Sequence, residues 1–490
     1  MSDRVDRHGR PGGPAVPRAS AAPAFAVLGC ALALAGCALA PQPPREEIAR
    51  QAMPNVAPPA QWAAAVGAPG TVRDNWLASL NEPRLDALVA EAIAYNADLR
   101  IAAARVEAAV AYLKAANSPL WPQVNVVGRG GGKMSGDSSG LSGIGLFAAW
   151  ELDLWGRVRS EARATELQYD SAKLDAEYAR QSIAALVAKG WIAAIDARMQ
   201  RAQAEAALVA SEQLAVLARE RLRVGSGDEY DLALARAAVE TQRDAVRSLE
   251  LAQQNALRAL EVLVGRYPAA TIAVADALPA FPGDAPSGVP SELLERRPDV
   301  VAAERRVAAA FYRVEGAKAA QLPRITLTAN FTSLESSLFV LQNRDNPLFS
   351  AGAGLVQPIF LGGLLEAQVD ARTAEQKAAI AEYGKIGVRA FGEVEGALAG
   401  GQSAAERETI LVRSVRENER AVVLADARFR VGSVDLSAVK QQQLALYGAR
   451  VALLRIRSER LVQRVNLNLA LGGSFDAPPA TTSDASAAQR

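Results

Sequence analysis

The chain has 490 residues, and its composition excludes several kinds of chemistry. It contains a single histidine, His8, and two cysteines, Cys30 and Cys37. A segment ending at Gly36 has the character of a removable leader, so the mature chain would keep no histidine and only one cysteine. Histidine acid-base catalysis, disulfides and the usual zinc sites are then excluded, and no cofactor is expected, although catalysis by carboxylates alone stays open. The formal net charge of +1, about −1 without the leader, gives no indication of a nucleic-acid partner.

The first 36 residues have the pattern of a secretory signal peptide, because arginines precede an alanine- and leucine-rich run that ends at Gly36. The sequence Leu34-Ala35-Gly36-Cys37 has the form of a bacterial lipoprotein cleavage site, so we expect the Cys37 thiol to carry a lipid. Ala38 follows where an aspartate would favour inner-membrane retention. By resemblance to lipoproteins generally, this favours the outer membrane. The alternative is a short apolar segment with a chance cysteine.

Most of the chain is predicted to form long helices. Apolar residues between Gly156 and Arg223 fall at spacings of three and four, which indicates an amphipathic helix. After a break at Gly225 and Gly227, a period of 3.5 residues runs from Leu232 to Leu263 and returns from Leu444 to Val465, as in coiled coils. The longest helix would extend on the order of 100 Å. An ordinary helical bundle is the alternative. The first apolar stripe consists of Ile183, Leu186, Val187, Gly190, Trp191, Ala194 and Ile195.

Four segments alternate polar and apolar residues with period two, which predicts strands of about the length that a tilted membrane strand requires. Four strands leave two open edges that lipid cannot satisfy, so several copies of the chain would have to close a barrel together. A small soluble sheet packed on the helices is the alternative. Trp121, Trp150 and Trp155 flank these strands, either as interfacial aromatics or as core residues. The strands are expected at about 121–130, 142–152, 323–332 and 349–358.

An internal repeat organises these elements. Asp98-Leu99 reappears 201 residues later as Asp299-Val300, and Pro122 reappears as Pro323. Each half therefore reads as helix, two strands, long helix, turn and helix. The expected organisation is a signal peptide (1–36), an anchor and tether (37–74), a first repeat (75–268), an inter-repeat equatorial segment (269–290), a second repeat (291–475) and a disordered tail (476–490).

Several separate motifs occur in one order along residues 75–475, and together they resemble the outer membrane efflux protein family. The resemblance is to its TolC-like, OprM/NodT-type lipoprotein branch. It implies an α+β membrane protein that forms a homotrimer, with a twelve-stranded outer-membrane barrel, four strands per chain, continued by a long helical periplasmic barrel. It also implies two partners, a periplasmic adaptor (membrane fusion) protein and an inner-membrane RND-type transporter. The motifs are Trp150-Glu151-Leu152-Asp153-Leu154-Trp155-Gly156-Arg157, Arg296-Arg297-Pro298-Asp299-Val300, Pro358-Ile359-Phe360-Leu361-Gly362-Gly363 and Ala470-Leu471-Gly472-Gly473.

Glycines mark two kinds of turn. Gly156 and Gly362 lie where a strand meets a helix and would let the backbone turn from barrel to tube. Two similar turns end the long helices, and since a tube of helical hairpins must end in its turns, we expect them to dock the adaptor. Simple helix termination with a C-terminal glycine is the alternative. The expected docking residues are Arg223, Val224, Gly225, Ser226, Arg430, Val431, Gly432 and Ser433.

A periplasmic gate is a further hypothesis. Members of the family carry an acidic residue after the second turn, within a Leu-Asp-Ala-Gln-like run, but here the matching residues are Lys440-Gln441-Gln442-Gln443. Asp228, Asp231 and Asp435 lie nearby and, triplicated by symmetry, would form rings of like charge. The alternative is that these aspartates begin helices, where a carboxylate is favourable.

The resulting functional prediction is a passive exit duct in the outer membrane that catalyses no reaction. It would conduct drugs or other small toxic compounds out of the periplasm. A type I protein-secretion duct of the same architecture is the main alternative. A structural or adhesive lipoprotein and an envelope hydrolase that uses only carboxylates are further alternatives.

Overall fold

The computed structural model describes residues 43–64, 70–72, 74–129, 141–283, 286–336 and 347–476. Among these, residues 119–160 and 315–367 form one compact unit, and residues 43–118, 161–314 and 368–476 form a second. The first unit holds the strands of both sequence repeats, and the second holds most of the helical residues of both. The compact units therefore cut across the repeats instead of following them.

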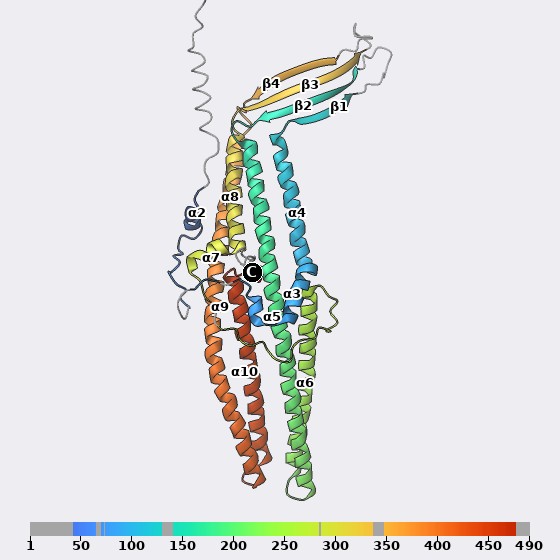
Figure 1. The fold of residues 1–490 in the computed structure, drawn as a ribbon, viewed down its shortest axis with the longest axis vertical. Coiled ribbons are helices and arrows are strands. Elements are labelled where there is room, and N and C mark those ends of the chain that lie inside the picture. Colours follow the sequence, from blue (N-terminus) through green and yellow to red (C-terminus); the bar gives the residue numbers. More distant parts are fainter. Residues whose placement is uncertain are drawn as a thin grey trace, which may run out of the picture. The chain divides into compact units, whose positions relative to one another are not determined.

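The first unit is built on a four-stranded antiparallel sheet with the order β1-β2-β3-β4 (Figure 1). Its strands are β1 (Gln123–Arg129), β2 (Leu141–Leu152), β3 (Arg324–Ser336) and β4 (Pro347–Val356). β3 continues past the predicted end at residue 332 because β2 pairs with it as far as Ser336. β4 ends at Val356, before the predicted residue 358, where Pro358 offers no backbone donor to a ladder. The outer edges belong to β1 and β4.

Long helices dominate the remainder of the chain (Figure 1). α5 and α9 contain 67 residues each, which corresponds to about 100 Å. Each leads through a short turn into a partner helix, α6 or α10, and so forms a helical hairpin. No helix within the described ranges is long and apolar enough to cross a membrane. The helices are α2 (Arg45–Ala52), α3 (Pro83–Tyr95), α4 (Ala97–Asn117), α5 (Arg157–Arg223), α6 (Glu229–Val264), α7 (Pro290–Arg296), α8 (Pro298–Ala319), α9 (Leu364–Arg430) and α10 (Leu436–Ala470), with short 3-10 turns at Leu77–Leu80 and Ser118–Leu120.

The predicted apolar stripe of α5 forms a core. Trp191, Ile192 and Ile195 are fully buried against α3, α6 and the end of α10. Leu186 is the exception, since 42% of its surface stays exposed. Ala184 and Ala188 are buried instead. The buried face of α5 is therefore rotated slightly from the face that the apolar spacing predicts.

The two repeats share one side-chain contact at a helix bend. Asn96 separates α3 from α4, and its Nδ2 donates to the carbonyl of Leu263 near the end of α6 at 2.8 Å. Arg297 separates α7 from α8, and its Nη1 donates to the carbonyl of Ala470, the last residue of α10, at 3.3 Å. The repeat therefore conserves the position of this contact while the side chain that makes it differs.

Arg297 is fully buried and makes a network that Asn96 does not. Its guanidinium pairs with Asp299 at 2.9 and 3.0 Å and with Glu393 at 2.6 Å, and it reaches the hydroxyl of Tyr178 at 3.2 Å. Burial opposes the charge of Arg297, but the hydrogen bonds and charges of Asp299, Tyr178 and Glu393 together outweigh burial and hold its pKa above the ordinary value. Removing one partner of such a pair typically costs about 3–5 kcal/mol, because the other charge stays buried alone.

Glycines end the second helix of each hairpin in the same way. Gly265 and Gly472 have φ angles of +81° and +69°, and the next residue donates to the carbonyl five positions before it, which makes a Schellman motif. A Cβ on Gly265 would lie 2.9 Å from the Tyr95 carbonyl oxygen, and one on Gly472 would lie 3.2 Å from that of Arg296. Only glycine therefore fits both the backbone conformation and the close approach of the neighbouring bend.

Residues 43–64, in the segment expected as a tether, pack on α9. Gly384 and Gly387 leave room for Ala52 and Met53, because a Cβ at either glycine would collide with them. Trp62 is buried and donates from Nε1 to the Ser287 carbonyl at 2.7 Å. The Glu395 carboxylate accepts the amides of residues 63 and 64 at 2.8 and 2.9 Å. Residues 43–64 are thus attached to α9 and to Ser287 at several points.

Candidate channel surfaces: the strand sheet and the hairpin tips

The strand register places apolar side chains in one row across the sheet. Val126 pairs with Leu146, Leu146 with Phe331, and Phe331 with Phe349. Directly paired residues point to the same face of an antiparallel sheet. All four side chains are exposed, between 47% and 73%. The sheet therefore presents an uncovered apolar face.

The adjacent row points to the opposite face and is more polar. It contains Asn125, Phe147, Asn330 and Ser350, of which the last two are joined by a side-chain hydrogen bond. On this face β3 also carries Thr326, Thr328 and Thr332, which alternate with Asn330. An apolar face beside a polar one is the arrangement of a sheet with lipid on one side and water on the other.

The joint between β2 and α5 accounts for the tryptophan- and acid-rich motif before Arg157. Glu151 forms a two-pronged ion pair with Arg157 at 2.8 and 3.0 Å. Asp153 accepts the amides of Val158 and Arg159 and so caps the amino end of α5. Gly156 lies between them with a φ angle of +75°, which a residue with a Cβ would adopt only at a cost.

The joint after β4 also contains left-handed glycines. Gly362 and Gly363 have φ angles of +61° and +82°, and α9 begins at Leu364. The preceding Ile359 and Phe360 are almost fully exposed. This joint leaves a second uncovered apolar segment in the first unit.

The three flanking tryptophans have different environments. Trp121 is largely exposed, as an interfacial aromatic would be. Trp150 and Trp155 are half-buried and donate from Nε1 to the carbonyls of Leu120 and Pro323 at 3.1 and 2.7 Å. These two fix the ends of the strands as well as lying beside them.

The expected docking residues form two matching turns. Gly225 and Gly432 have φ angles of +73° and +76°, and the serine after each donates its amide to the carbonyl five residues earlier at 2.9 Å. Both turns are Schellman motifs, so the expected role in helix termination is present. Val224 and Val431 are nevertheless exposed. Termination alone does not account for two exposed valines at equivalent positions.

The two turns lie at the ends of hairpins that pack on each other. A small core joins α5 and α6 to α9 and α10, and the Arg221 guanidinium stacks over the Phe429 ring at 4.8 Å. Lys440 adds a hydrogen bond from Nζ to the Leu234 carbonyl at 3.3 Å. The core residues are Ala215, Ala218, Leu232, Ala235, Val239, Phe429, Leu436 and Val439.

Two of the expected gate residues have structural tasks. Asp228 caps α6 by accepting the amide of Asp231, and Asp435 caps α10 by accepting the amide of Ala438. The Ala438 amide and the Ser437 hydroxyl lower the pKa of Asp435, so this carboxylate is charged at neutral pH. Asp231 is half-buried and Gln441 is exposed. Cys37 lies outside the described residues.

Sequence reasoning missed three features of the second unit. The charge network of Arg297 lies within a quoted motif, but its partner Glu393 is distant in sequence and no spacing indicates it. Glu261, on the otherwise apolar face of α6, is fully buried and accepts backbone amides from residues 270–272. An acidic residue on an apolar stripe was the available signal. A cavity beside Phe281 has no signature in the sequence.

The described part of the chain contains no cluster of three His, Cys, Asp or Glu side chains arranged to hold a metal ion. The surfaces that distinguish the described chain are the two-faced sheet and the paired turns.

A charge on the apolar face of the sheet tests the assignment of the faces. Leu146→Arg should reduce the yield of membrane-inserted protein, since an arginine facing lipid costs about 2–4 kcal/mol at the bilayer midplane. Asn330→Arg places the same charge on the opposite face and should insert normally. Quantification of both variants in isolated membranes checks this. Equal yields would show that the apolar face does not contact lipid.

Comparison with known proteins gives one consistent result. Residues 88–266 and 289–473 match the outer membrane efflux protein family. The chain is 32% identical over 446 residues to the pyoverdine export outer membrane protein OpmQ of Pseudomonas putida, covering 87% of this chain and 94% of the relative. It is 30% identical over 463 residues to the cation efflux system protein CusC of Escherichia coli K12, covering 90% and 97%.

Solved structures agree with the sequence relatives. The outer-membrane channel OprN superposes with a TM-score of 0.80 at 26% identity, over 89% of this chain and 99% of that chain. The predicted fold class is confirmed by this likeness together with the four-stranded sheet and long helices described above. The relatives are efflux and channel proteins of the outer membrane. The chain belongs to the outer membrane efflux protein family and is an outer-membrane efflux channel.

Proposed function

We propose that three copies of the chain form the exit duct of a tripartite RND-type efflux pump. The observation that carries this proposal is the apolar row that crosses all four strands while β1 and β4 keep open edges. Lipid satisfies no backbone hydrogen bond, so these edges must pair with neighbouring copies. Three sheets give a closed barrel of twelve strands, and the hairpins α5/α6 and α9/α10 continue it as a periplasmic tube.

The exported compounds are small and toxic, and the transporter selects them. Relatives of similar identity are named for pyoverdine export, cation efflux and toluene efflux. One fold thus serves chemically unrelated cargo, which fits a passive duct that accepts whatever an inner-membrane transporter supplies. A type I protein-secretion duct remains the second candidate, and a polypeptide requirement in a transport assay would favour it.

The two exposed turns dock a periplasmic adaptor protein. They comprise residues 223–226 and 430–433, they match in backbone geometry, and each presents an exposed valine. Three chains would give six such turns around one aperture. A partner that recognises one turn therefore recognises both kinds.

Bulky residues at the glycines of the turns test this docking. The double variant Gly225→Leu, Gly432→Leu should lower drug resistance to that of a strain without the channel, because a side chain at φ near +75° reshapes both turns. Gly283→Leu is the matched control, since Gly283 also has a positive φ and open space around it but lies outside the turns. Normal resistance in the double variant, with the trimer intact on a gel, would refute the docking role.

A lipid on Cys37 anchors the chain in the outer membrane. The proposal rests on the cleavage-site sequence and is supported by residues 43–64, which attach the chain downstream of the anchor to Ser287 through Trp62 and to α9 through Glu395. The anchor would hold a newly exported protomer at the membrane surface, where the concentration of its partners is highest.

Metabolic labelling with palmitate tests the anchor. The wild-type chain should incorporate label and Cys37→Ser should incorporate none. Cys30→Ser is the matched control. It removes the other cysteine of the same amino-terminal region but keeps Cys37, so the variant should be labelled normally. Label in the Cys37→Ser variant would exclude this site of lipidation.

The aspartates near the turns form the periplasmic gate. Asp228 and Asp435 are helix caps, and threefold symmetry would set three copies of each, with Asp231 and Gln441, around the aperture. Rings of like charge select cations and oppose collapse of the lumen.

Conductance of the purified trimer in a planar bilayer tests the gate. The variant Asp228→Ser, Asp435→Ser keeps both helix caps, because serine caps as well as aspartate, but removes six charges from the trimer. Cation selectivity should fall severalfold, because the variant removes the negative charges that attract cations to the aperture. Asp370→Asn, on α9 far from the turns in sequence, should leave selectivity unchanged. If the cap variant conducts like the wild type, the aspartates are helix caps only.

A further inference from the structure

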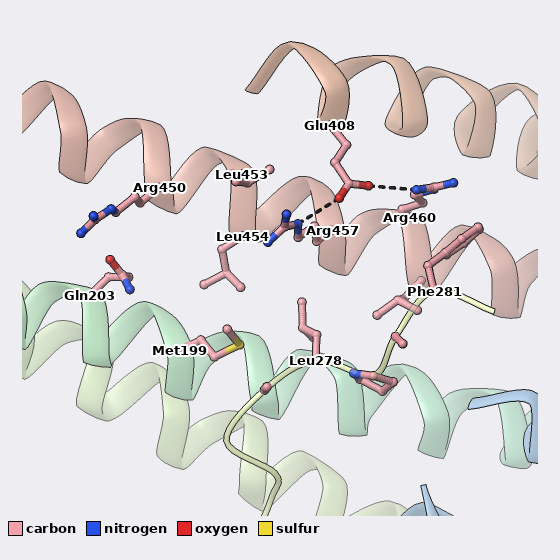
Figure 2. Close-up of a pocket in the computed structure, with 14 residues that line it drawn as sticks. Met199, Gln203, Leu278, Phe281, Glu408, Arg450, Leu453, Leu454, Arg457 and Arg460 are labelled. Atoms are coloured by element: carbon pink, nitrogen blue, oxygen red, sulfur yellow. Dashed lines mark hydrogen bonds and ion pairs between the residues drawn. The ribbon is translucent and has the colours of Figure 1, made fainter. Parts of the chain in front are cut away.

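A cavity of about 470 Å³ lies in the second unit, and its lining residues belong neither to the strand sheet nor to the hairpin turns. Its walls come from α5, α9, α10 and the connector between the repeats, residues 277–281 (Figure 2). This volume is in the range of sites that hold drug-sized molecules.

The cavity has two polar ends and an apolar middle. Arg450 and Gln203 lie at one end, and Glu408 with Arg457 and Arg460 lies at the other (Figure 2). Met199, Leu278 and Leu454 lie between these ends (Figure 2). A molecule that fills the cavity must therefore combine a polar group with an apolar body.

Positive charge exceeds negative charge along the walls. Glu408 is the one carboxylate among the lining residues, and it accepts from Arg457 Nε at 2.9 Å and Arg460 Nη1 at 3.0 Å. Burial disfavours the charged carboxylate, but these two bonds lower the pKa of Glu408, so it is ionised. Arg450 is the third guanidinium, and its partner Glu419 lies outside the cavity wall.

One guanidinium of the wall, that of Arg460, has a donor without an acceptor among the described residues. Arg460 stacks on the Phe281 ring at 3.7 Å, which fixes its plane, and its buried Nε has no hydrogen-bond acceptor in the part of the chain that the structure describes. An arginine carries five N–H donors, and an unmatched buried donor costs about 1–3 kcal/mol. A bound acceptor would relieve that cost.

We propose that the cavity binds a small amphiphilic organic anion. Its acidic group, a carboxylate or its equivalent, lies at the end where Arg457 and Arg460 together face the single carboxylate Glu408. Its apolar part lies on Met199, Leu278 and Leu454. Bonds from guanidinium to carboxylate are strong because both groups are charged. The connector wall places the site beside the joint between the repeats and not in a turn or on the sheet. The site is thus distinct from the docking and membrane surfaces.

Equilibrium dialysis of 2-naphthoate against the full-length protein in phosphatidylcholine nanodiscs tests the proposal, with empty nanodiscs as background. The anion should bind saturably at one site per chain, and the uncharged 2-naphthamide should bind at least about tenfold more weakly, the loss expected for a charged hydrogen bond. Dialysis measures no transport, so its result is independent of the proposed function.

Three variants locate the binding. Arg450→Gln, Arg457→Gln should raise the Kd at least about tenfold, and it leaves Glu408 paired with Arg460. Ala280→Phe fills the cavity from the exposed connector without removing charge and should also abolish binding. Arg455→Gln, on the same helix but outside the cavity wall, is the matched control and should bind normally.

Several results would overturn the proposal. They are no saturable binding above empty nanodiscs, equal affinity for the anion and the amide, and equal affinity in the wild type and the cavity variants. A loss of adaptor binding in Arg450→Gln, Arg457→Gln without any binding of naphthoate would assign the cavity to a protein partner instead.

Discussion

The unpaired backbone of β1 and β4 is the constraint on which the rest of the assembly depends. Within the sheet, β2 and β3 are paired on both sides, whereas β1 and β4 are each paired on one. Water can satisfy the free backbone groups at the edges of a soluble sheet. The exposed apolar row that begins at Val126 indicates that these edges lie in lipid, where only another strand can satisfy them. A hollow passage thus arises from an incomplete protomer, because only symmetry closes the edges. The interior needs no ligand site of its own.

The repeat satisfies a second constraint, the attachment of short helices to long hairpins. At matching positions Asn96 and Arg297 each bond the carboxyl end of a hairpin, and Gly265 and Gly472 each allow the close approach of the bend. The repeats then diverge. Asn96 is neutral and makes no ion pair. Arg297 pairs with acidic residues, and its buried guanidinium contacts α5, α9 and α10. The same bend is therefore stabilised by a neutral hydrogen bond in the first repeat and by a buried ion-pair network in the second.

The sequence was informative where a local rule acts alone. Period-two alternation located the strands, and left-handed glycines such as Gly225 marked the turns, since backbone geometry there permits few alternatives. The sequence was less informative where residues distant in the chain determine which side chains are buried. Leu186 fits the apolar stripe but is exposed, because the face that packs is set by the helices around α5. The aspartates at 228 and 435 allowed two interpretations, and the structure shows their capping role, while a role in gating depends on other subunits.

The cavity beside Phe281 follows from the way in which the two repeats are joined. A duplicated chain has one connector between its halves, so a wall built from residues 277–281 occurs once per protomer and has no counterpart after the second repeat within the described chain. Symmetry therefore explains the turns and the bends but not this site. The stacking of Arg460 on Phe281 couples α10 to the connector, and the shared bonds of Glu408 couple α10 to α9. A molecule bound there would contact both hairpins and the connector at once.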